Sequence, residues 1–222
     1  MHSLIFDTTA SACNIVLLKD KQIVSKYSQT MDFGQSEVLI PEIKTILDNN
    51  KITFSEIGAV FVCVGPGSFT GVRASISAAK VFSIARSEII VSGFSAFDAY
   101  KSLLDAENVA KCNAVIIETK RDDFYVSFYN HELKPLSEPQ SLSREEIINF
   151  LKKQNCTITL IGDGVERFLS QQSGLQFLSI KMLDSITIEA LSKIALQQLK
   201  QKKFNFPKPL YIRPADVSCH SI

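Results

Sequence analysis

The segment that most constrains this chain is a glycine-rich turn, Gly65 to Gly71 (GPGSFTG), between a buried strand and a helix. The preceding residues 59–64 form an unbroken apolar run, which predicts a strand buried on both faces. Helical spacing begins after the turn and predicts a helix over 72–86, with Thr70 as its N-cap. Glycines at positions 65, 67 and 71 either let the backbone approach an anion such as a phosphate, or let the strand and helix pack closely. The turn matches neither G-x-x-x-x-G-K-[ST] nor G-x-G-x-x-G, so both interpretations stay open.

The predicted helix over 72–86 has two apolar arcs, whereas an ordinary surface helix has one. The arc that we expect to face the sheet contains Ala74, Ala78, Val81, Phe82 and Ala85. The second arc consists mostly of small, uncharged side chains: Val72, Ser75, Ile76, Ala79 and Ser83. Either another part of this chain covers the second arc or a second protein does.

Composition narrows the class of protein. The 222 residues are 45% hydrophobic and 21% charged, which is typical of a soluble globular chain with one large or two small domains. The net charge of +1 argues against a dedicated nucleic-acid binder. No apolar run reaches the length of about 18 residues that predicts a membrane span. We therefore expect a protein with no membrane contact.

Cysteine and histidine positions argue against disulfides and metals. The five cysteines form no C-x-x-C pair and are scattered along the chain, at Cys13, Cys63, Cys112, Cys156 and Cys219. Without a signal-peptide pattern they indicate reduced thiols in a cytoplasmic protein. The histidines lie too far apart for a metal pair, at His2, His131 and His220.

The order of predicted elements occurs twice. The first half has strands over 3–6, 13–18 and 22–28, a helix over 35–49, the strand 59–64, the helix 72–86 and a short strand at 89–91. The second half has strands over 114–118, 124–129 and near 133–137, a helix over 143–154, a strand over 157–161, and helices over 165–171 and 187–201. A helix over 96–104 connects them. We predict subdomains 1–104 and 105–222, with the C-terminal helix and tail packing back.

Two βββαβα units in one chain, with Asp7, Thr8 and Thr9 after the first strand, resemble the actin-like (ASKHA, ribonuclease H-like) α/β fold. That resemblance implies that a nucleotide lies between the halves and that the turn after the first strand reaches its phosphates. It makes a nucleotide-binding group, functional or vestigial, of Asp7, Thr8, Thr9, Gly65, Gly67 and Ser68.

Four segments together resemble the bacterial TsaB (YeaZ) family: Leu4 to Thr9, Ser36 to Pro41, Gly65 to Arg73 and Pro209 to Pro214. The resemblance implies a non-catalytic, cytoplasmic subunit that pairs with a catalytic paralogue, TsaD. With the ATPase TsaE they form the threonylcarbamoyl modification of adenosine 37 in tRNAs that read codons starting with A. It further implies no cofactor of its own, ATP in the assembled complex, tRNA contact only through the complex, and a homodimer in isolation.

In that family two helices contact TsaD as a helical bundle, and by position they are about 35–47 and 72–84 here. The resemblance therefore favours a partner as the cover of the second arc. The partner-binding residues that it predicts are Ser36, Glu37, Leu39, Ile40, Ile43, Leu47, Val72, Arg73, Ser75, Ile76, Ala79, Lys80 and Ser83. The catalytic relative holds its metal with two histidines on the first helix, and residues 33–37 contain none. Glu118 and Lys120 replace the Asp and first Arg of a family Asp-Ala-Arg-Arg turn.

Three other functions fit the sequence less well. An ATP-dependent small-molecule kinase would use the nucleotide group with residues 162–164, but the turn at 65–71 lacks the carboxylates that phosphoryl transfer needs. A metallopeptidase would need a metal site or an activated nucleophile. Direct tRNA contact would use basic and aromatic residues of the tail, which otherwise stay solvated or anchor the tail: Lys200, Lys202, Lys203, Phe204, Phe206, Lys208, Tyr211 and Arg213.

Overall fold

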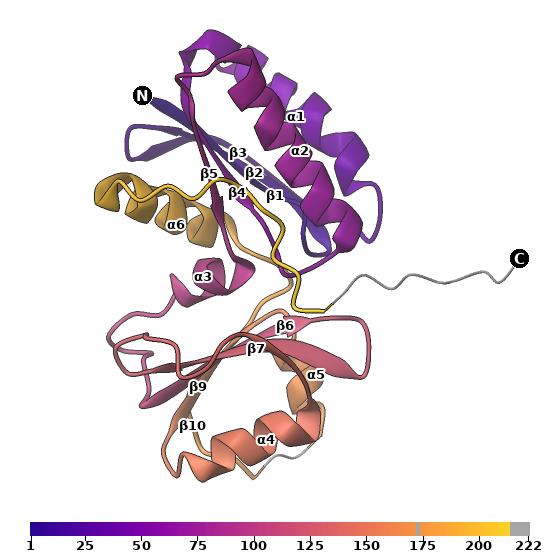
Figure 1. The fold of residues 1–222 in the computed structure, drawn as a ribbon, viewed down its shortest axis with the longest axis vertical. Helices are drawn as coiled ribbons and strands as arrows, with labels where there is room; N and C mark the ends of the chain where they lie inside the picture. The colour runs from indigo at the N-terminus through magenta and orange to yellow at the C-terminus, as the bar shows by residue number, and fades with distance from the viewer. Residues whose placement is uncertain (172–173, 214–222) are drawn as a thin grey trace, which may run out of the picture.

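The computed structural model describes residues 1–171 and 174–213 and contains two five-stranded sheets, one in each half of the molecule (Figure 1). Pro214, Cys219 and His220, which the sequence analysis named, lie outside the described residues. Among the helices of those residues, none combines the length and the hydropathy that a bilayer crossing requires.

The first sheet has the strand order β3-β2-β1-β4-β5. Its strands are β1 (His2–Asp7), β2 (Ala12–Lys19), β3 (Gln22–Thr30), β4 (Ile57–Cys63) and β5 (Ile90–Phe94). The first three pair antiparallel, whereas β4 is parallel to both β1 and β5. The apolar run of β4 is buried along its length because helices cover both faces of this sheet.

The second sheet repeats this plan with the order β10-β9-β6-β7-β8. Its strands are β6 (Cys112–Glu118), β7 (Asp123–Asn130), β8 (Gln140–Ser143), β9 (Ile158–Gly162) and β10 (Phe177–Met182). Again three strands pair antiparallel and the last two join in parallel. The two βββαβα units of the actin-like fold are therefore confirmed.

Helices cover both sheets, and one helix that follows each sheet in the chain packs on the other sheet. They are α1 (Gln35–Asn49), α2 (Phe69–Ala85), α3 (Ala96–Lys101), α4 (Arg144–Lys153), α5 (Val165–Leu169) and α6 (Ile188–Gln201), with a short 3-10 helix, η1 (Phe54–Glu56), before β4. Helices α1 and α2 pack on one face of the first sheet, and α6 packs on its other face (Figure 1). Helix α3 follows the first sheet but packs on β6 and β9.

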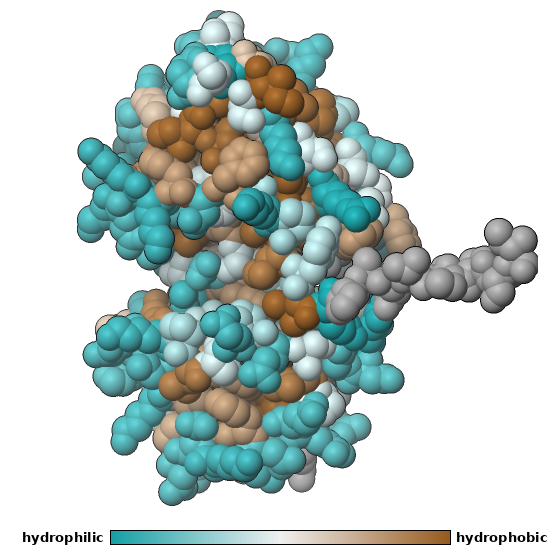
Figure 2. Space-filling model, in the orientation of Figure 1, coloured by the Kyte–Doolittle hydropathy of each residue, from teal (hydrophilic) through white to brown (hydrophobic). Residues whose placement is uncertain are grey.

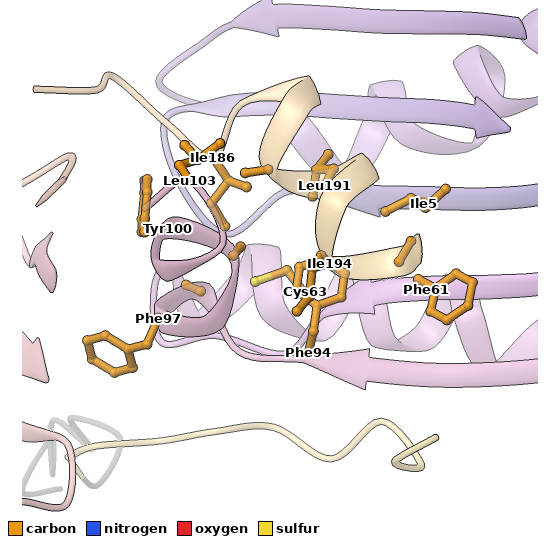
Figure 3. Packing of buried hydrophobic residues seen from close by; sticks show 14 of the residues in the cluster. Ile5, Phe61, Cys63, Phe94, Phe97, Tyr100, Leu103, Ile186, Leu191 and Ile194 are labelled. Carbon is orange, nitrogen blue, oxygen red and sulfur yellow. The ribbon is translucent and has the colours of Figure 1, made fainter. Parts of the chain in front are cut away.

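This arrangement gives the two halves a common core. Figure 3 shows Leu191 and Ile194 of α6 between Tyr100 of α3 and the first-sheet residues Ile5 and Phe61. The same buried cluster includes residues of β6 and β9. A cut at residue 104 would leave α6 with the second half, away from the sheet that it covers. The division at 104 stays a prediction.

Three elements of the structure differ from the prediction. Strand β10 was not predicted, because its polar Ser179 and Lys181 interrupt the apolar signal and its pairing partner β9 is distant in sequence. The third strand of the second half lies at β8 and not near 133–137, where Leu133 has a positive φ and the chain makes only one isolated bridge, Tyr129 to Pro135. Helix α3 ends at Lys101 and not at residue 104.

Helix α2 begins earlier than predicted and is rotated relative to the prediction. Its N-cap is Ser68, whose Oγ accepts a hydrogen bond from the Gly71 amide, and not Thr70. This chain, and not a partner as the resemblance favoured, covers most of the second arc, because Val72, Ser75, Ile76 and Ala79 are buried within it. Their small size lets α2 lie close to the strands beneath it.

Candidate functional site

A cleft of about 580 Å³ lies between the halves, at the carboxyl ends of the strands. The turns after β1, β4, β6 and β9 contribute to its walls, and Figure 2 shows the narrow waist where the halves meet. Carboxyl ends of strands are where ligands bind in open α/β sheets. Of the six predicted nucleotide-binding residues, Thr9, Gly67 and Ser68 line this cleft, whereas Asp7, Thr8 and Gly65 are not among its lining residues.

The turn after β1 directs its polar groups into the protein. Asp7 is fully buried, and its Oδ1 accepts hydrogen bonds from the amide and the hydroxyl of Thr9, at 2.9 and 2.7 Å. Burial raises the pKa of the Asp7 carboxyl, and Oδ2 has no hydrogen-bond partner among the described residues. Thr8 Oγ1 donates to the Gly71 carbonyl at 2.8 Å and lies 2.7 Å from Ser75 Oγ. These contacts join the turn to α2.

Glycines after β4 serve close packing. A Cβ atom on Gly71 would lie 1.9 Å from the Thr8 carbonyl oxygen, and one on Gly67 would lie 2.3 Å from that of Thr9. The Ser68 amide donates to the same Thr9 oxygen at 2.7 Å. No larger residue fits either position, since a backbone oxygen cannot move aside like a flexible side chain. Of the two interpretations of the glycine-rich turn, the geometry supports close packing.

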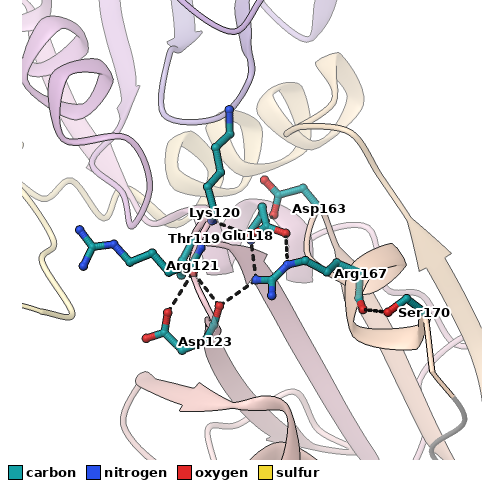
Figure 4. A network of polar contacts seen from close by, with 8 residues as sticks. All are labelled: Glu118, Thr119, Lys120, Arg121, Asp123, Asp163, Arg167 and Ser170. Carbon is teal, nitrogen blue, oxygen red and sulfur yellow. Dashed lines mark hydrogen bonds and ion pairs between the residues drawn. The ribbon is translucent and has the colours of Figure 1, made fainter.

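The turn after β6 is held by an ion pair. Arg167 donates to both carboxylate oxygens of Glu118, at 2.7 and 2.8 Å, and to the Asp123 carbonyl at 2.8 Å (Figure 4). The Thr119 hydroxyl donates to that carbonyl as well. Lys120 points away from this network toward the first half, where its Nζ lies 3.6 Å from an Asp32 carboxylate oxygen (Figure 4). The network fixes the turn, and Lys120 bridges the cleft.

Asp163, directly after β9, is the cleft residue with a pKa near neutrality. Its Oδ1 accepts a hydrogen bond from the Glu118 amide at 3.0 Å. Burial is the main reason that its pKa rises to about 7, and the negative charge of Glu118 adds to the effect. The hydroxyl of buried Tyr100 lies close enough to lower this pKa, and Asp163 in turn raises the pKa of Tyr100. Asp163 could exchange a proton at neutral pH.

A single titratable carboxyl is not a complete catalytic site. In residues 1–171 and 174–213, no group of three or more His, Cys, Asp or Glu side chains could hold a metal ion. The thiols of Cys13, Cys63 and Cys112 are buried, and burial raises the pKa of each.

The predicted partner-binding residues divide by exposure. Ser36, Glu37, Ile40, Arg73 and Lys80 are exposed on α1 and α2, and Ser83 is half-buried. Apart from the four arc residues of α2 already described, the buried members are Leu39, Ile43 and Leu47, which face the first sheet.

The sequence analysis missed two exposed apolar residues of α2. Val81 is 58% exposed and Ile84 is 84% exposed, and Ile40 on the neighbouring α1 is 53% exposed. We call the surface of α1 and α2 made by Ile40, Arg73, Lys80, Val81 and Ile84 the outer helix face. In Figure 2, brown surface appears over the end of the molecule that carries the C-terminal part of α2. The sequence analysis assigned Val81 to the arc that faces the sheet, and it placed Ile84 on neither apolar arc.

Comparison with known proteins finds sequence similarity to TsaD and TsaB proteins. The family model described as "TsaD: tRNA N6-adenosine threonylcarbamoyltransferase" matches residues 34–93, which include α1 and α2. The tRNA threonylcarbamoyladenosine biosynthesis protein TsaB of Haemophilus influenzae is 29% identical over 95% of this chain and 92% of that protein. TsaB of Buchnera aphidicola from Schizaphis graminum is 27% identical over 81% of this chain and 86% of that protein.

Solved structures agree on the fold. YeaZ from Pseudomonas aeruginosa superposes with a TM-score of 0.76 at 20% identity, over 95% of this chain and 99% of that one. The ethanolamine utilization protein EutJ from Carboxydothermus hydrogenoformans superposes with a TM-score of 0.52 at 10% identity, over 88% and 89%. At these identities the likeness concerns the arrangement of elements.

Proposed function

Since the chain belongs to the TsaB (YeaZ) family, we propose that it acts in tRNA threonylcarbamoyladenosine biosynthesis as a non-catalytic subunit that binds and supports a TsaD-like catalytic paralogue. The names of the relatives of this chain support its place in the pathway. The surface and the cleft of this chain support the scaffold role.

The outer helix face is the observation that carries the proposal. Ile84 and Val81 project from α2, and Ile40 projects from the adjacent α1, where this chain leaves them uncovered. Single exposed apolar residues are common, but several on one pair of packed helices are typical of an interaction surface. Helix pairs pack well against other helix pairs through ridges and grooves of such side chains.

A TsaD-like paralogue is the partner that we infer for this face. The TsaD model matches the segment that contains both helices, so a TsaD-like protein has a corresponding helix pair. Two related helix pairs can pack against each other about a pseudo-twofold axis, in the way that two copies of one surface pack in a symmetric dimer. The isolated chain is then expected to form a homodimer through this face until the paralogue displaces one copy.

The cleft supports a non-catalytic role. Asp7 is buried and does not line the cleft, and Glu118 is paired with Arg167, so neither carboxylate is placed to hold a metal-bound phosphate. We infer that the chain has no cofactor of its own, that ATP is needed only by the assembled complex with a TsaE-like ATPase, and that tRNA is contacted through the complex.

Reconstitution tests the proposal. The TsaD-like and TsaE-like proteins, ATP, threonylcarbamoyl-AMP and unmodified tRNA are combined with and without this chain, and modified adenosine is measured by mass spectrometry of nucleosides. We expect modification only when the chain is present, none by the chain alone, and an undiminished rate with Asp163→Asn. Full modification without the chain would contradict the scaffold role, and loss of activity with a correctly folded Asp163→Asn variant would contradict the non-catalytic one.

The cleft favours one second candidate, a nucleotide-dependent small-molecule kinase. Thr9, Gly67 and Ser68 line a space of about 580 Å³, which lies in the range of small-molecule sites. Calorimetric titration of the isolated chain with ATP separates the two candidates. Stoichiometric binding, followed by phosphoryl transfer to a small molecule, would favour the kinase.

A further inference from the structure

The C-terminal tail, which we define as residues 204–213, is attached along the first sheet and the cleft. After α6 it runs along β5 toward the N-terminal end of α2 (Figure 1). The Gly93 amide donates to the Asn205 carbonyl at 2.7 Å, and the Asn205 amide donates to Ser92 Oγ at 2.9 Å. Farther along, the Leu210 amide donates to the Val64 carbonyl at 2.8 Å. The tail therefore covers the outer edge of β5, which would otherwise be an open sheet edge.

The end of the tail is fixed to the second half. Arg213 forms an ion pair with Asp123 of β7 at 2.8 Å, and its guanidinium lies 5.3 Å from the centroid of the Tyr125 ring. Asp123 is itself bound by Thr119 and Ser141. The path of the tail past α2 is thus determined at both ends by contacts that lie outside α2.

Aromatic side chains of this fixed segment remain at the surface. Phe206 is 58% exposed and Tyr211 is 44% exposed, although the backbone beside each is hydrogen-bonded or packed. A segment that served only to cover an edge would place such rings inward, because burying an aromatic side chain is worth about 1.5–3 kcal/mol. Their exposure calls for another explanation.

The exposed rings lie against α2. The Tyr211 ring centroid is 5.5 Å from that of Phe69, and the Arg73 guanidinium lies 3.6 Å above the Phe69 ring and 3.4 Å from the Tyr211 hydroxyl. Phe206 lies beside Lys80, with 5.9 Å between the ammonium and the ring. Lys80 is about three helical turns from Phe69, so the tail runs beside α2 in the opposite direction. The tail and the outer helix face adjoin along this length.

We propose that Phe206 and Tyr211 of the tail form, with the outer helix face, one docking surface for the TsaD-like paralogue. This inference rests on the proposed function. Phe, Tyr and Arg are the residue types enriched in interface centres, and Phe69, Arg73, Phe206 and Tyr211 supply them here. Because Phe206 lies beside Lys80 of α2, a partner that packs on α2 at Lys80 can also contact the tail. Arg213 is a positioning residue that holds the tail in reach.

The test measures the affinity of the purified chain for the TsaD-like paralogue by calorimetric titration. Phe206→Glu should weaken binding by at least about tenfold, which is typical of an aromatic anchor. Leu136→Glu is the matched control, since Leu136 is a similarly exposed apolar residue of the second half, and its affinity should be unchanged. Thermal unfolding of both variants should match that of the original chain, because neither residue is buried.

A third variant tests the tail separately from the proposed function. Ile84→Glu changes the outer helix face without touching the tail. If Ile84→Glu abolishes binding and Phe206→Glu leaves it unchanged, the tail inference fails while the proposed function stands. If both variants bind like the original chain, the location of the whole surface is wrong. If Phe206→Glu disrupts only a homodimer of this chain, the surface is real but the paralogue is not its occupant, and the inference fails.

Discussion

The two halves carry equivalent helix pairs that differ in what they expose. Helices α1 and α2 pack on the first sheet as α4 and α5 pack on the second. Every exposed residue of α4 and α5 is polar: Glu145, Glu146, Asn149, Lys152, Lys153 and Glu166. On α1 and α2 the exposed residues include Ile40, Val81 and Ile84. Helix α2 also has 17 residues, against five in α5.

This difference indicates that the repeat has been specialised. Both pairs meet the requirement of covering a sheet, so the fold does not explain apolar residues on the outside of only one of them. Charged residues keep α4 and α5 in solvent, whereas the longer α2 extends an apolar surface. The function that we propose uses α1 and α2, the pair whose exposed apolar side chains are not needed for folding.

The largest effect is expected at the buried side of α2. Ala79 is fully buried against the first sheet, so Ala79→Arg would place an unpaired charge there and lower the free energy of unfolding by about 4 kcal/mol or more. Urea denaturation measures this loss. Lys80→Ala, on the exposed side one residue away, should stay within about 0.5 kcal/mol. A stable Ala79→Arg variant would contradict the orientation of α2.

The next effect compares two glycines at the N-terminal ends of α2 and α5. Gly71→Ala would place Cβ 1.9 Å from a backbone oxygen and should cost about 3 kcal/mol of unfolding free energy. Gly164→Ala meets its nearest atoms at 3.0 and 3.1 Å, so a small shift relieves it and the cost should be about 1 kcal/mol. Chemical denaturation of both variants checks the order. Equal losses would mean that the backbone around Gly71 is not packed more tightly than the backbone around Gly164.

A smaller effect is expected at the end of β6, because the Glu118 carboxylate there has a cationic partner, Arg167. Arg167→Met removes two hydrogen bonds to the Glu118 carboxylate and one to the Asp123 carbonyl, and because the pair is partly exposed it should cost about 1–2 kcal/mol. The matched control is Lys134→Met, whose ion pair with Glu132 is more exposed, and we expect a loss within about 0.5 kcal/mol. Urea denaturation distinguishes the two. Indistinguishable losses would show that the Glu118 turn is held by other contacts.

A separate effect, on the pH dependence of stability, is expected from Asp163. Its pKa is about 7 in the folded protein and near the ordinary value of about 3.9 when unfolded. The folded state therefore binds more protons between these values, and stability falls as the pH rises through that window. Asp163→Asn cannot ionise, so its thermal unfolding temperature relative to the original chain should rise from pH 5 to pH 8. A constant difference would contradict the raised pKa.

Sequence patterns predicted most of the fold because most signals are local. The apolar run of β4 and the spacing of α1 and α6 each identify an element without its neighbours. Strand β10 was not predicted because its pairing with β9, and not its own sequence pattern, determines its conformation. Helix α3 packs on the second sheet and α6 packs on the first. No local pattern predicts this, because it depends on which sheet face the other helices leave uncovered.

The site was harder to predict than the fold. A helical wheel separates arcs of α2 but does not tell which arc faces the sheet, and here the small-residue side does so because Ser75 and Ala79 permit close packing. Gly67 and Gly71 fit both a phosphate and a neighbouring backbone until the position of Thr8 and Thr9 is known. Asp163 was expected only as part of a possible cleft turn, since burial, which raises its pKa, is invisible in sequence.

The most direct test of the account is the affinity of the TsaD-like paralogue for two variants at equivalent helix pairs, Ile84→Glu on α2 and Lys152→Glu on α4. Titration calorimetry with each folded variant gives the dissociation constants. We predict that Ile84→Glu weakens binding by at least about tenfold and that Lys152→Glu leaves it unchanged. Equal affinities for the two variants, or a loss confined to Lys152→Glu, would contradict the claim that the outer helix face binds the partner.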